Sequence, residues 1–279
     1  MVTAAVVAYV AIVAFLYVAQ RSMQYPRDGA RVDLARAAIP RAEEASLTTS
    51  DGERIIVWIV PPADSKPVLI FFQGNGGTIA NRADRFRELA EDGIGLVAVS
   101  YRGYGGSSGS PSETGLNYDA RAAYDEAVKR FGADRIVLYG QSLGTGVAVR
   151  LAADVKVKAL ILEAAYFSAA DVAKGRYPFA PIALLMKDQY RSDELIGRIR
   201  VPVLMMHGER DGIIPIGQGV ALFNASSAPR RFVRFPAAGH NDLPRHGADS
   251  QVLRFLADVD EGRVEGVQLR SVGVAAPQD

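Results

Sequence analysis

Short apolar runs alternate with amphipathic stretches over most of this chain, and that alternation limits the possible folds more than any other feature. Six runs of four to six residues are mostly apolar, as is typical of strands buried on both faces: residues 68–72, 95–100, 135–139, 159–162, 203–206 and 232–235. Between them, apolar residues recur at helical spacing in 81–91, 117–130, 143–153, 217–225 and 250–256. This order predicts the α/β class, with a mainly parallel central sheet and helices on both faces.

Other elements flank or interrupt this pattern. Two β-rich runs, 46–49 and 55–60, are separated by the turn Asp51-Gly52 and predict an antiparallel hairpin ahead of the parallel strands. We therefore expect the globular domain to span residues 42–260. The tail, 261–279, has little periodicity and is expected to be loosely ordered, with a short terminal strand as the alternative.

The segment 165–200 is too long for an ordinary connection and contains Pro178 and Pro181. It predicts a small helical cap over a site. Its apolar side chains either bind an amphiphilic ligand or close the core of the cap itself: Phe179, Ile182, Leu184, Leu185 and Met186.

The N-terminus carries an uncharged apolar run, 2–19, of about the 17 to 25 residues that cross a bilayer as a helix. We expect a transmembrane anchor at 1–20 and a connector at 21–41, with a cleaved signal peptide or a buried core helix as alternatives. A signal peptide fits less well because no Lys or Arg precedes the run and Tyr17 is bulky where a small residue is needed. Arginines follow the run and predict a cytoplasmic globular domain: Arg21, Arg27, Arg31, Arg36 and Arg41.

Composition excludes several classes of partner and site. Lys and Arg total 32 against 31 Asp and Glu, so a net charge of +1 gives no case for nucleic-acid binding. The absence of cysteine excludes disulfides and thiolate metal sites. Only three histidines are present, which argues against a histidine-rich metal centre. We predict neither a metal nor an organic cofactor, and the sequence does not indicate an oligomeric state.

The most specific motif is Gly140-Gln141-Ser142-Leu143-Gly144, which follows the predicted strand 135–139 and precedes the predicted helix 143–153. A serine on such an elbow has an exposed hydroxyl in a strained turn, and the glycines relieve crowding between strand and helix. The N-terminus of the helix also favours negative charge nearby. The motif therefore predicts that Ser142 is a nucleophile rather than part of an ordinary tight turn.

A serine hydroxyl is a weak nucleophile and needs a base, which in turn needs an acid to orient it. With a nucleophile elbow, the acid and the histidine follow the serine in that order. His240, in a loop after the last predicted strand, is the expected base. His207 is expected to pack or hydrogen-bond beneath the site, and His246 to face solvent. Asp211 is the expected acid, with Glu163 at the end of the preceding strand as the alternative.

Acyl transfer also needs amide donors for the oxyanion. We assign the backbone N–H of Leu143 and that of Asn75, which lies in the glycine-rich loop 73–77 after a predicted strand. The same loop could cradle a phosphate, but it lacks the Lys-Ser/Thr of a P-loop and the spacing of a dinucleotide fingerprint.

With these motifs in this order, residues 42–257 resemble the α/β-hydrolase superfamily. Further motifs look like its bud-emergence-related branch, which is similar to the α/β-hydrolase-domain depalmitoylases: AQRSMQYP, FFQGNGG, SYRGYGGSSG, GQSLGTGVA and RYPFAPIALLMKDQYRSDELI. The resemblance implies an α/β-hydrolase fold and a membrane-tethered serine hydrolase. The family usually has His in place of Gln73, and this departure bears on the geometry of the glycine-rich loop.

The sequence thus favours a serine hydrolase that cleaves an ester or thioester, on lipid-like or acylated small molecules, through an acyl-enzyme on Ser142. A serine peptidase acting on short peptides shares the fold and the triad and remains an alternative. A noncatalytic membrane-bound binding protein on the same scaffold is a further alternative, although it would be expected to have lost a member of the triad. The anchor is expected to raise the local concentration of substrate.

Overall fold

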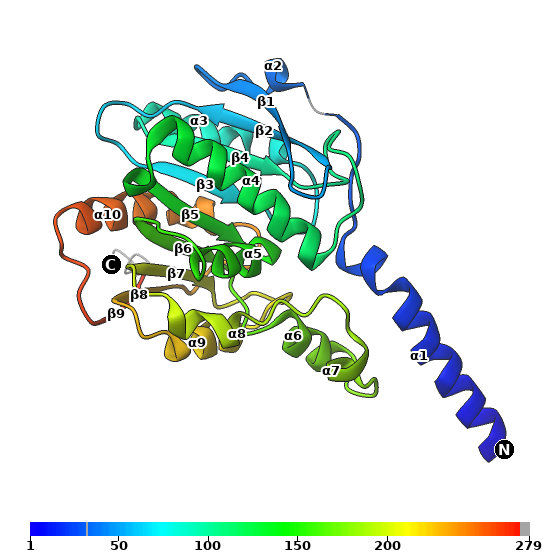
Figure 1. The fold of residues 1–279 in the computed structure, drawn as a ribbon. Coiled ribbons are helices and arrows are strands. Elements are labelled where there is room, and N and C mark those ends of the chain that lie inside the picture. Colours follow the sequence, from blue (N-terminus) through cyan, green and yellow to red (C-terminus); the bar gives the residue numbers. More distant parts are fainter. Residues whose placement is uncertain (32, 274–279) are drawn as a thin grey trace, which may run out of the picture.

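The computed structural model describes residues 1–31 and 33–273, and within them nine strands form one sheet (Figure 1). The strand order is β1-β2-β4-β3-β5-β6-β7-β8-β9. Strand β2 is antiparallel to β1 and β4, and the other neighbouring pairs are parallel, so the predicted sheet with its N-terminal hairpin is confirmed. The strands are β1 Glu43–Thr48, β2 Arg54–Val60, β3 Val68–Phe72, β4 Gly95–Ser100, β5 Ile136–Gln141, β6 Ala159–Glu163, β7 Val203–Gly208, β8 Arg230–Phe235 and β9 Val267–Ser271.

Helices cover both faces of the sheet, as predicted (Figure 1). One face packs against α4 Glu113–Phe131, α5 Leu143–Ala152 and α9 Ile216–Ala225. The other packs against α3 Ala83–Glu91 and α10 Ala248–Asp260. Short 3₁₀ turns complete the connections: η1 Ile79–Arg82, η2 Ala133–Arg135, η3 Ile196–Arg198 and η4 Leu243–His246.

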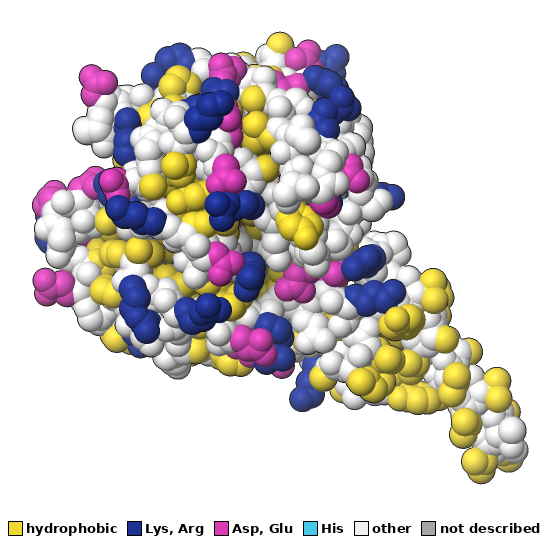
Figure 2. All heavy atoms as spheres, viewed as in Figure 1, with side chains coloured by type: hydrophobic (Ala, Val, Ile, Leu, Met, Phe, Trp, Pro, Cys, Tyr) yellow, Lys and Arg dark blue, Asp and Glu magenta, His cyan; other side chains and the backbone are white. Residues whose placement is uncertain are grey.

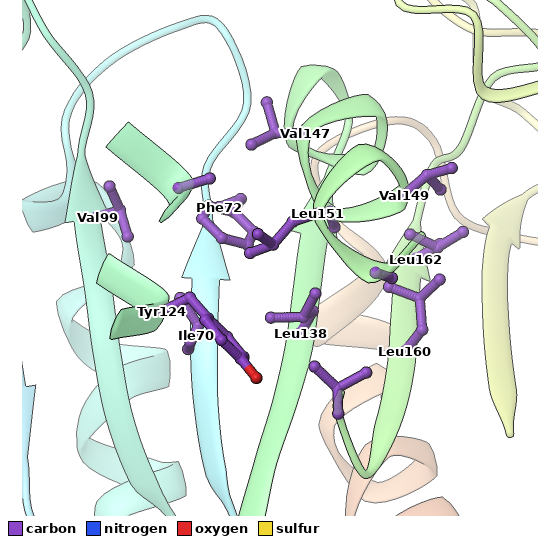
Figure 3. Packing of buried hydrophobic residues seen from close by; sticks show 14 of the residues in the cluster. Ile70, Phe72, Val99, Tyr124, Leu138, Val147, Val149, Leu151, Leu160 and Leu162 are labelled. Atoms are coloured by element: carbon purple, nitrogen blue, oxygen red, sulfur yellow. The ribbon is translucent and has the colours of Figure 1, made fainter. Parts of the chain in front are cut away.

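The central strands are continuously apolar because each lies between two helical layers. Ile70, Leu138 and Leu160 are neighbours in the register of β3, β5 and β6, and all three side chains are buried in the same cluster as Leu151 of α5 (Figure 3). Residues next to them along each strand point to the opposite face, where they meet α3 and α10. Burial on both faces holds the carboxyl ends of these strands at one rigid edge, and the loops at that edge carry the candidate site.

Helix α1, Val2–Gln24, projects from this domain (Figures 1 and 2). Its 23 residues are long and apolar enough to cross a membrane, so it is a candidate span. Figure 2 shows hydrophobic side chains along the projecting helix, whereas charged groups of both signs are interspersed over the domain.

The segment 21–41, expected to be a connector, begins with the last turn of α1 and then packs on the domain. Tyr25 is buried in the hydrophobic cluster on the face of the sheet that α4, α5 and α9 cover. Ile39 is buried in the cluster on the opposite face, with α3 and α10. The short helix α2, Leu34–Ala37, begins where the Asp33 side chain accepts a hydrogen bond from the amide of Ala35. Such an N-cap satisfies an amide that has no partner within the helix.

The segment 165–200, expected to be a cap, contains α6 Ala169–Arg176, α7 Ile182–Leu185 and α8 Ser192–Leu195. Its two halves lie in different surroundings. Ile196 and Ile199, just after α8, are buried in the core beside α9. Helices α6 and α7 instead lie on the side of the domain where α1 projects (Figure 1).

The C-terminal tail, 261–279, includes β9, which pairs in parallel with β8. The side chains of this edge strand are mostly exposed. This is the short terminal strand that the sequence left as an alternative, and residues 274–279 of the predicted tail lie outside the described part of the chain.

Candidate active site

Ser142 lies on a sharp turn between β5 and α5. Its backbone has φ 51° and ψ −119°, a region that L-residues rarely adopt without a functional reason. The turn is held by the Ser142 amide, which donates to the carbonyl of Glu163 over 2.8 Å. A Cβ at Gly144 would lie 2.0 Å from the carbonyl oxygen of Phe72, and one at Gly140 would lie 2.4 Å from the carbonyl oxygen of Gly144. Only glycine fits this close approach of strand and helix.

The structure brings Ser142, His240 and Asp211 together from three loops at the carboxyl edge of the sheet. His240 Nε2 lies 2.9 Å from Ser142 Oγ, and His240 Nδ1 lies 2.7 Å from Asp211 Oδ2. With Nδ1 donating to the carboxylate, Nε2 can accept the proton of the serine hydroxyl. The arrangement has the geometry of a nucleophile, a general base and an orienting acid.

Asp211 is held as a carboxylate by several donors. Burial opposes its ionisation, but hydrogen bonds from His207 and His240, together with the amide of Ile214, outweigh burial and hold its pKa well below the usual range. The Asp211 Oδ1 atom accepts from the amides of Ile213 and Ile214, each over 2.8 Å, which leaves Oδ2 facing His240. A carboxylate fixed on both oxygens can select one tautomer of the imidazole.

His207, expected to pack or hydrogen-bond near the site, is fully buried. Its Nε2 atom lies 2.9 Å from the carbonyl of Ile214 and 3.4 Å from Asp211 Oδ2. It therefore supports the loop that carries Asp211. His246 lies on η4, partly exposed, with Nε2 3.7 Å from Asp242.

Glu163, the alternative acid, takes part in a different network. Its carboxylate accepts from Arg85 Nη1 over 2.9 Å, from Gln141 Nε2 over 2.8 Å and from the Tyr139 hydroxyl. The side chain is fully buried, and although burial favours the neutral acid, the charge of Arg85 lowers its pKa. Because Gln141 precedes the nucleophile, this network holds the elbow from below.

The two residues assigned as oxyanion donors border the same space as Ser142. The Leu143 amide is in the first turn of α5, where backbone N–H groups have no intrahelical partner. Asn75 is held from both ends, since its side-chain amide donates to the carbonyl of Gln24 and its own carbonyl accepts from the Tyr104 hydroxyl, each over 2.9 Å. These contacts fix the glycine-rich loop beside the serine.

A cavity of about 480 Å³ opens at Ser142. Helices α6 and α7 line it with mostly apolar side chains, and so does one face of α1. Of the apolar residues whose role the sequence left open, Ile182, Leu185 and Met186 line this cavity, whereas Phe179 and Leu184 are exposed at the surface. A mostly apolar pocket with a few convergent polar groups is the usual form of a small-molecule site.

Comparison with known proteins agrees with this fold. A family model described as "alpha/beta hydrolase fold" matches residues 67–181. Protein bem46 of Schizosaccharomyces pombe is 32% identical over 264 residues, which cover 88% of each chain. This chain belongs to the α/β-hydrolase family.

Two further similar proteins are informative. The lysophosphatidylserine lipase ABHD12 of Rattus norvegicus is 31% identical over 205 residues, which cover 65% of this chain and 51% of that protein. A solved esterase of Pyrococcus furiosus superposes with a TM-score of 0.70 over 85% of this chain and 97% of its own, at 15% identity. At this low identity, the structural similarity to the esterase shows a shared fold.

Gln73 stands where the resemblance to the family implies a His. Its side chain is fully buried, and neither its amide nitrogen nor its oxygen has a hydrogen-bond partner among the described residues. The backbone carbonyl of Gln73 accepts from the Tyr101 hydroxyl over 3.1 Å. The substitution therefore leaves the backbone of the loop supported.

Sequence reasoning missed the contribution of α1 to the cavity. Val13, Leu16 and Gln20 line it, whereas the sequence predicts an anchor for this run, with a signal peptide or a buried core helix as alternatives. The sequence does contain polar residues that point to this contact. Gln20 and Gln24 lie one helical turn apart, where the apolar run 2–19 ends. Paired amides on one face of such a helix indicate contact with protein.

The Glu163 network predicts an acid-dependent stability. Because its folded-state pKa lies below the ordinary 4.5, ionised Glu163 stabilises the fold at neutral pH, and this contribution is lost as the pH falls through the folded-state pKa. Glu163→Gln should lower the free energy of unfolding at pH 7 by about 1.5 to 3 kcal/mol, because it removes one charged partner of buried Arg85, which keeps its ion pair with Asp249. Below about pH 4.5 the difference from wild type should shrink. Denaturant unfolding of both proteins over a range of pH measures this difference in free energy. A difference that does not change with pH would contradict the ionised state of Glu163 in the fold.

Proposed function

We propose that this protein is a serine hydrolase that cleaves a carboxylic ester or thioester through an acyl-enzyme on Ser142. The observation that carries the proposal is the chain of short contacts from Ser142 Oγ through His240 to Asp211, with Ser142 lining a mostly apolar cavity. Membership of the α/β-hydrolase family supports the same reaction class.

In the proposed mechanism, Ser142 Oγ attacks the acyl carbon while His240 Nε2 takes the hydroxyl proton. The imidazolium so formed is stabilised by Asp211, which remains ionised throughout because its donors favour the carboxylate. His240 then gives the proton to the leaving alcohol or thiol. Water repeats the sequence on the acyl-enzyme and releases the acid, and Ser142 recovers its proton.

The tetrahedral intermediates carry negative charge on the former carbonyl oxygen. We assign its stabilisation to the backbone amides of Leu143 and Asn75, with the N-terminus of α5 adding a favourable dipole. Amides fixed before the reaction do not need to reorganise as the charge develops. The contacts of Asn75 with Gln24 and Tyr104 support this assignment, because they hold its loop in place.

The proposed substrates are lipid-like or acylated small molecules. The cavity that contains Ser142 is lined mostly by apolar side chains of α1, α6 and α7. Among the relatives, one carries the name of a lysophospholipid lipase and a solved structure of the same fold that of an esterase. An apolar acyl group bound there would present its carbonyl carbon to the serine.

We further propose that α1 anchors the protein as a single span, with the hydrolase domain in the cytoplasm. Arginines at positions 21, 27, 31, 36 and 41 all follow the apolar run, and the positive-inside tendency favours their side as cytoplasmic. A reporter that works only in the cytoplasm should therefore be active when it is fused after Asp279. Activity of an outside reporter at the same position would reverse the orientation.

Ser142 should react with a fluorophosphonate probe, because its hydroxyl lies beside a base and the proposed oxyanion donors. Ser142→Ala should abolish labelling with the fold retained. Ser227→Ala, which changes an exposed serine after α9, is the matched control and should label like wild type. Gel fluorescence measures labelling and circular dichroism measures folding. Undiminished labelling of folded Ser142→Ala would overturn the proposal.

Asp211→Asn should lower turnover by up to about 10⁴-fold while substrate binding changes little, because the wrong histidine tautomer would be favoured. Glu163→Gln tests the alternative acid and should retain most of its turnover per folded molecule. The measurement is kcat on a soluble short-chain ester, normalised to folded protein. A large loss in Glu163→Gln with little loss in Asp211→Asn would transfer the role of the acid to Glu163.

A further inference from the structure

Helix α1 is attached to the segment that closes the cavity through side chains near its C-terminal end. Gln20 donates to the carbonyl of Leu185 over 3.2 Å and accepts from the amide of Lys187 over 2.7 Å. Arg21 makes a two-pronged ion pair with the buried carboxylate of Asp188, with N···O distances of 2.8 and 3.1 Å. The position of this helix against α7 is therefore specified by polar contacts.

The end of α1 also reaches the candidate oxyanion loop. The Gln24 side chain donates to the Asp188 carbonyl over 2.9 Å, while the Gln24 carbonyl accepts from the side chain of Asn75. Just beyond, the hydroxyls of Tyr25 and Tyr190 lie 2.9 Å apart in the core. The base of α1 is thus a structural part of the site.

One stripe of α1 faces the cavity. The lining residues recur at intervals of three and four, as expected of a single helical face: Val13, Leu16, Tyr17, Gln20, Met23 and Gln24. The opposite face is exposed, with Phe15 at 67% and Val18 at 80% of their possible exposure. The helix therefore has a cavity face and an outward face, although both are apolar.

A second groove adjoins the cavity toward the N-terminal half of α1. Its volume is about 310 Å³, and it lies between Tyr9, Val10 and Ala14 of the helix and the two ends of α7. The lining residues that it shares with the cavity are Val13, Tyr17, Pro181 and Leu185. Beside it, the Tyr9 hydroxyl donates to the carbonyl of Phe179 over 3.0 Å. Polar groups therefore lie at the Ser142 end, and the groove becomes apolar away from it.

The length of this path suits a long acyl chain. At about 1.5 Å per helical residue, Gln24 and Tyr9 lie roughly 22 Å apart along the axis. Phe179 and Leu184, at 51% and 82% exposure, line neither space but add exposed apolar surface on the segment that carries α7. If α1 spans the bilayer, the outer groove and these side chains lie at the depth of the hydrocarbon layer.

We propose that the groove between α1 and α6–α7 takes the acyl chain of an ester lipid directly from the surrounding bilayer, with α1 as the wall that sets chain length. The proposal rests on the proposed hydrolase function. The carbonyl of the lipid lies at Ser142, and the tail extends past Leu16 and Val13 toward Tyr9. Hydrocarbon then moves from lipid to an apolar groove without exposure to water, so entry avoids the cost of hydrating the chain.

Two substitutions that fill the groove at different distances from Ser142 test this inference in the full-length protein. Leu16→Trp blocks the path nearer Ser142, and Val13→Trp blocks it about 4.5 Å farther along the helix. Phe15→Trp adds an indole to the outward face and is the matched control. The substrates are p-nitrophenyl esters from acetate to palmitate in phosphatidylcholine vesicles, and the readout is the longest chain that is hydrolysed efficiently.

We expect the longest accepted chain to shorten in Val13→Trp and to shorten further in Leu16→Trp. The palmitate-to-acetate rate ratio in Leu16→Trp should fall by roughly tenfold or more, as when about two methylenes lose their burial. Phe15→Trp should keep the wild-type profile. The same chain-length profile in all four proteins would overturn the proposal.

A binding experiment separates this inference from the hydrolase function. Folded Ser142→Ala protein in the same vesicles is irradiated with a palmitoyl ester that carries a diazirine in its chain, and cross-linked residues are mapped by mass spectrometry. Cross-links at Val13, Leu16 and Leu185 support the groove even if the hydrolase proposal fails. Cross-links confined to Phe15 and Val18 would show a lipid-facing helix only, and would overturn the groove.

Discussion

The close approach of α5 to β3 is the constraint on which the candidate site depends. Gly144 lies against the carbonyl of Phe72 at a distance that leaves no space for a Cβ. Because the helix begins there, Ser142 is forced into a positive φ and its side chain into the cavity. The Arg85–Glu163 pair, connected through Gln141, holds the same turn from the opposite side. A rigid elbow gives the loop that carries His240 one fixed partner.

Much of the fold and of the candidate constellation could be predicted from local patterns. Strands buried between two helical layers leave continuous apolar runs, so the run 68–72 coincides with β3. Asp211 and His240 follow β7 and β8, and parallel strands bring such loops to one edge. Their mutual distances required the structure, as did the placement of Glu163, because burial beside Arg85 depends on contacts 78 residues apart in sequence.

The role of α1 could not be predicted for a physical reason. Apolar side chains have the same pattern whether they face lipid tails or the wall of a protein cavity, since both surroundings are apolar. Leu16 and Phe15 are neighbours in sequence, yet one lines the cavity and the other faces outward. The partners of α1 lie far away in sequence, 51 residues for Asn75 and more than 160 for Asp188 and Tyr190, and only the tertiary structure shows them.

The attachment of α1 to Asp188 and Tyr190 bears on how the protein is made. The N-terminal helix leaves the ribosome first, while the residues that hold its base emerge much later in synthesis. If α1 is the anchor proposed above, it then has only lipid neighbours on the face that later borders Ser142. Under that proposal, membrane insertion and completion of the cavity are separate events in biogenesis, and a nascent chain released before Tyr190 would be integrated but would lack a wall of its site.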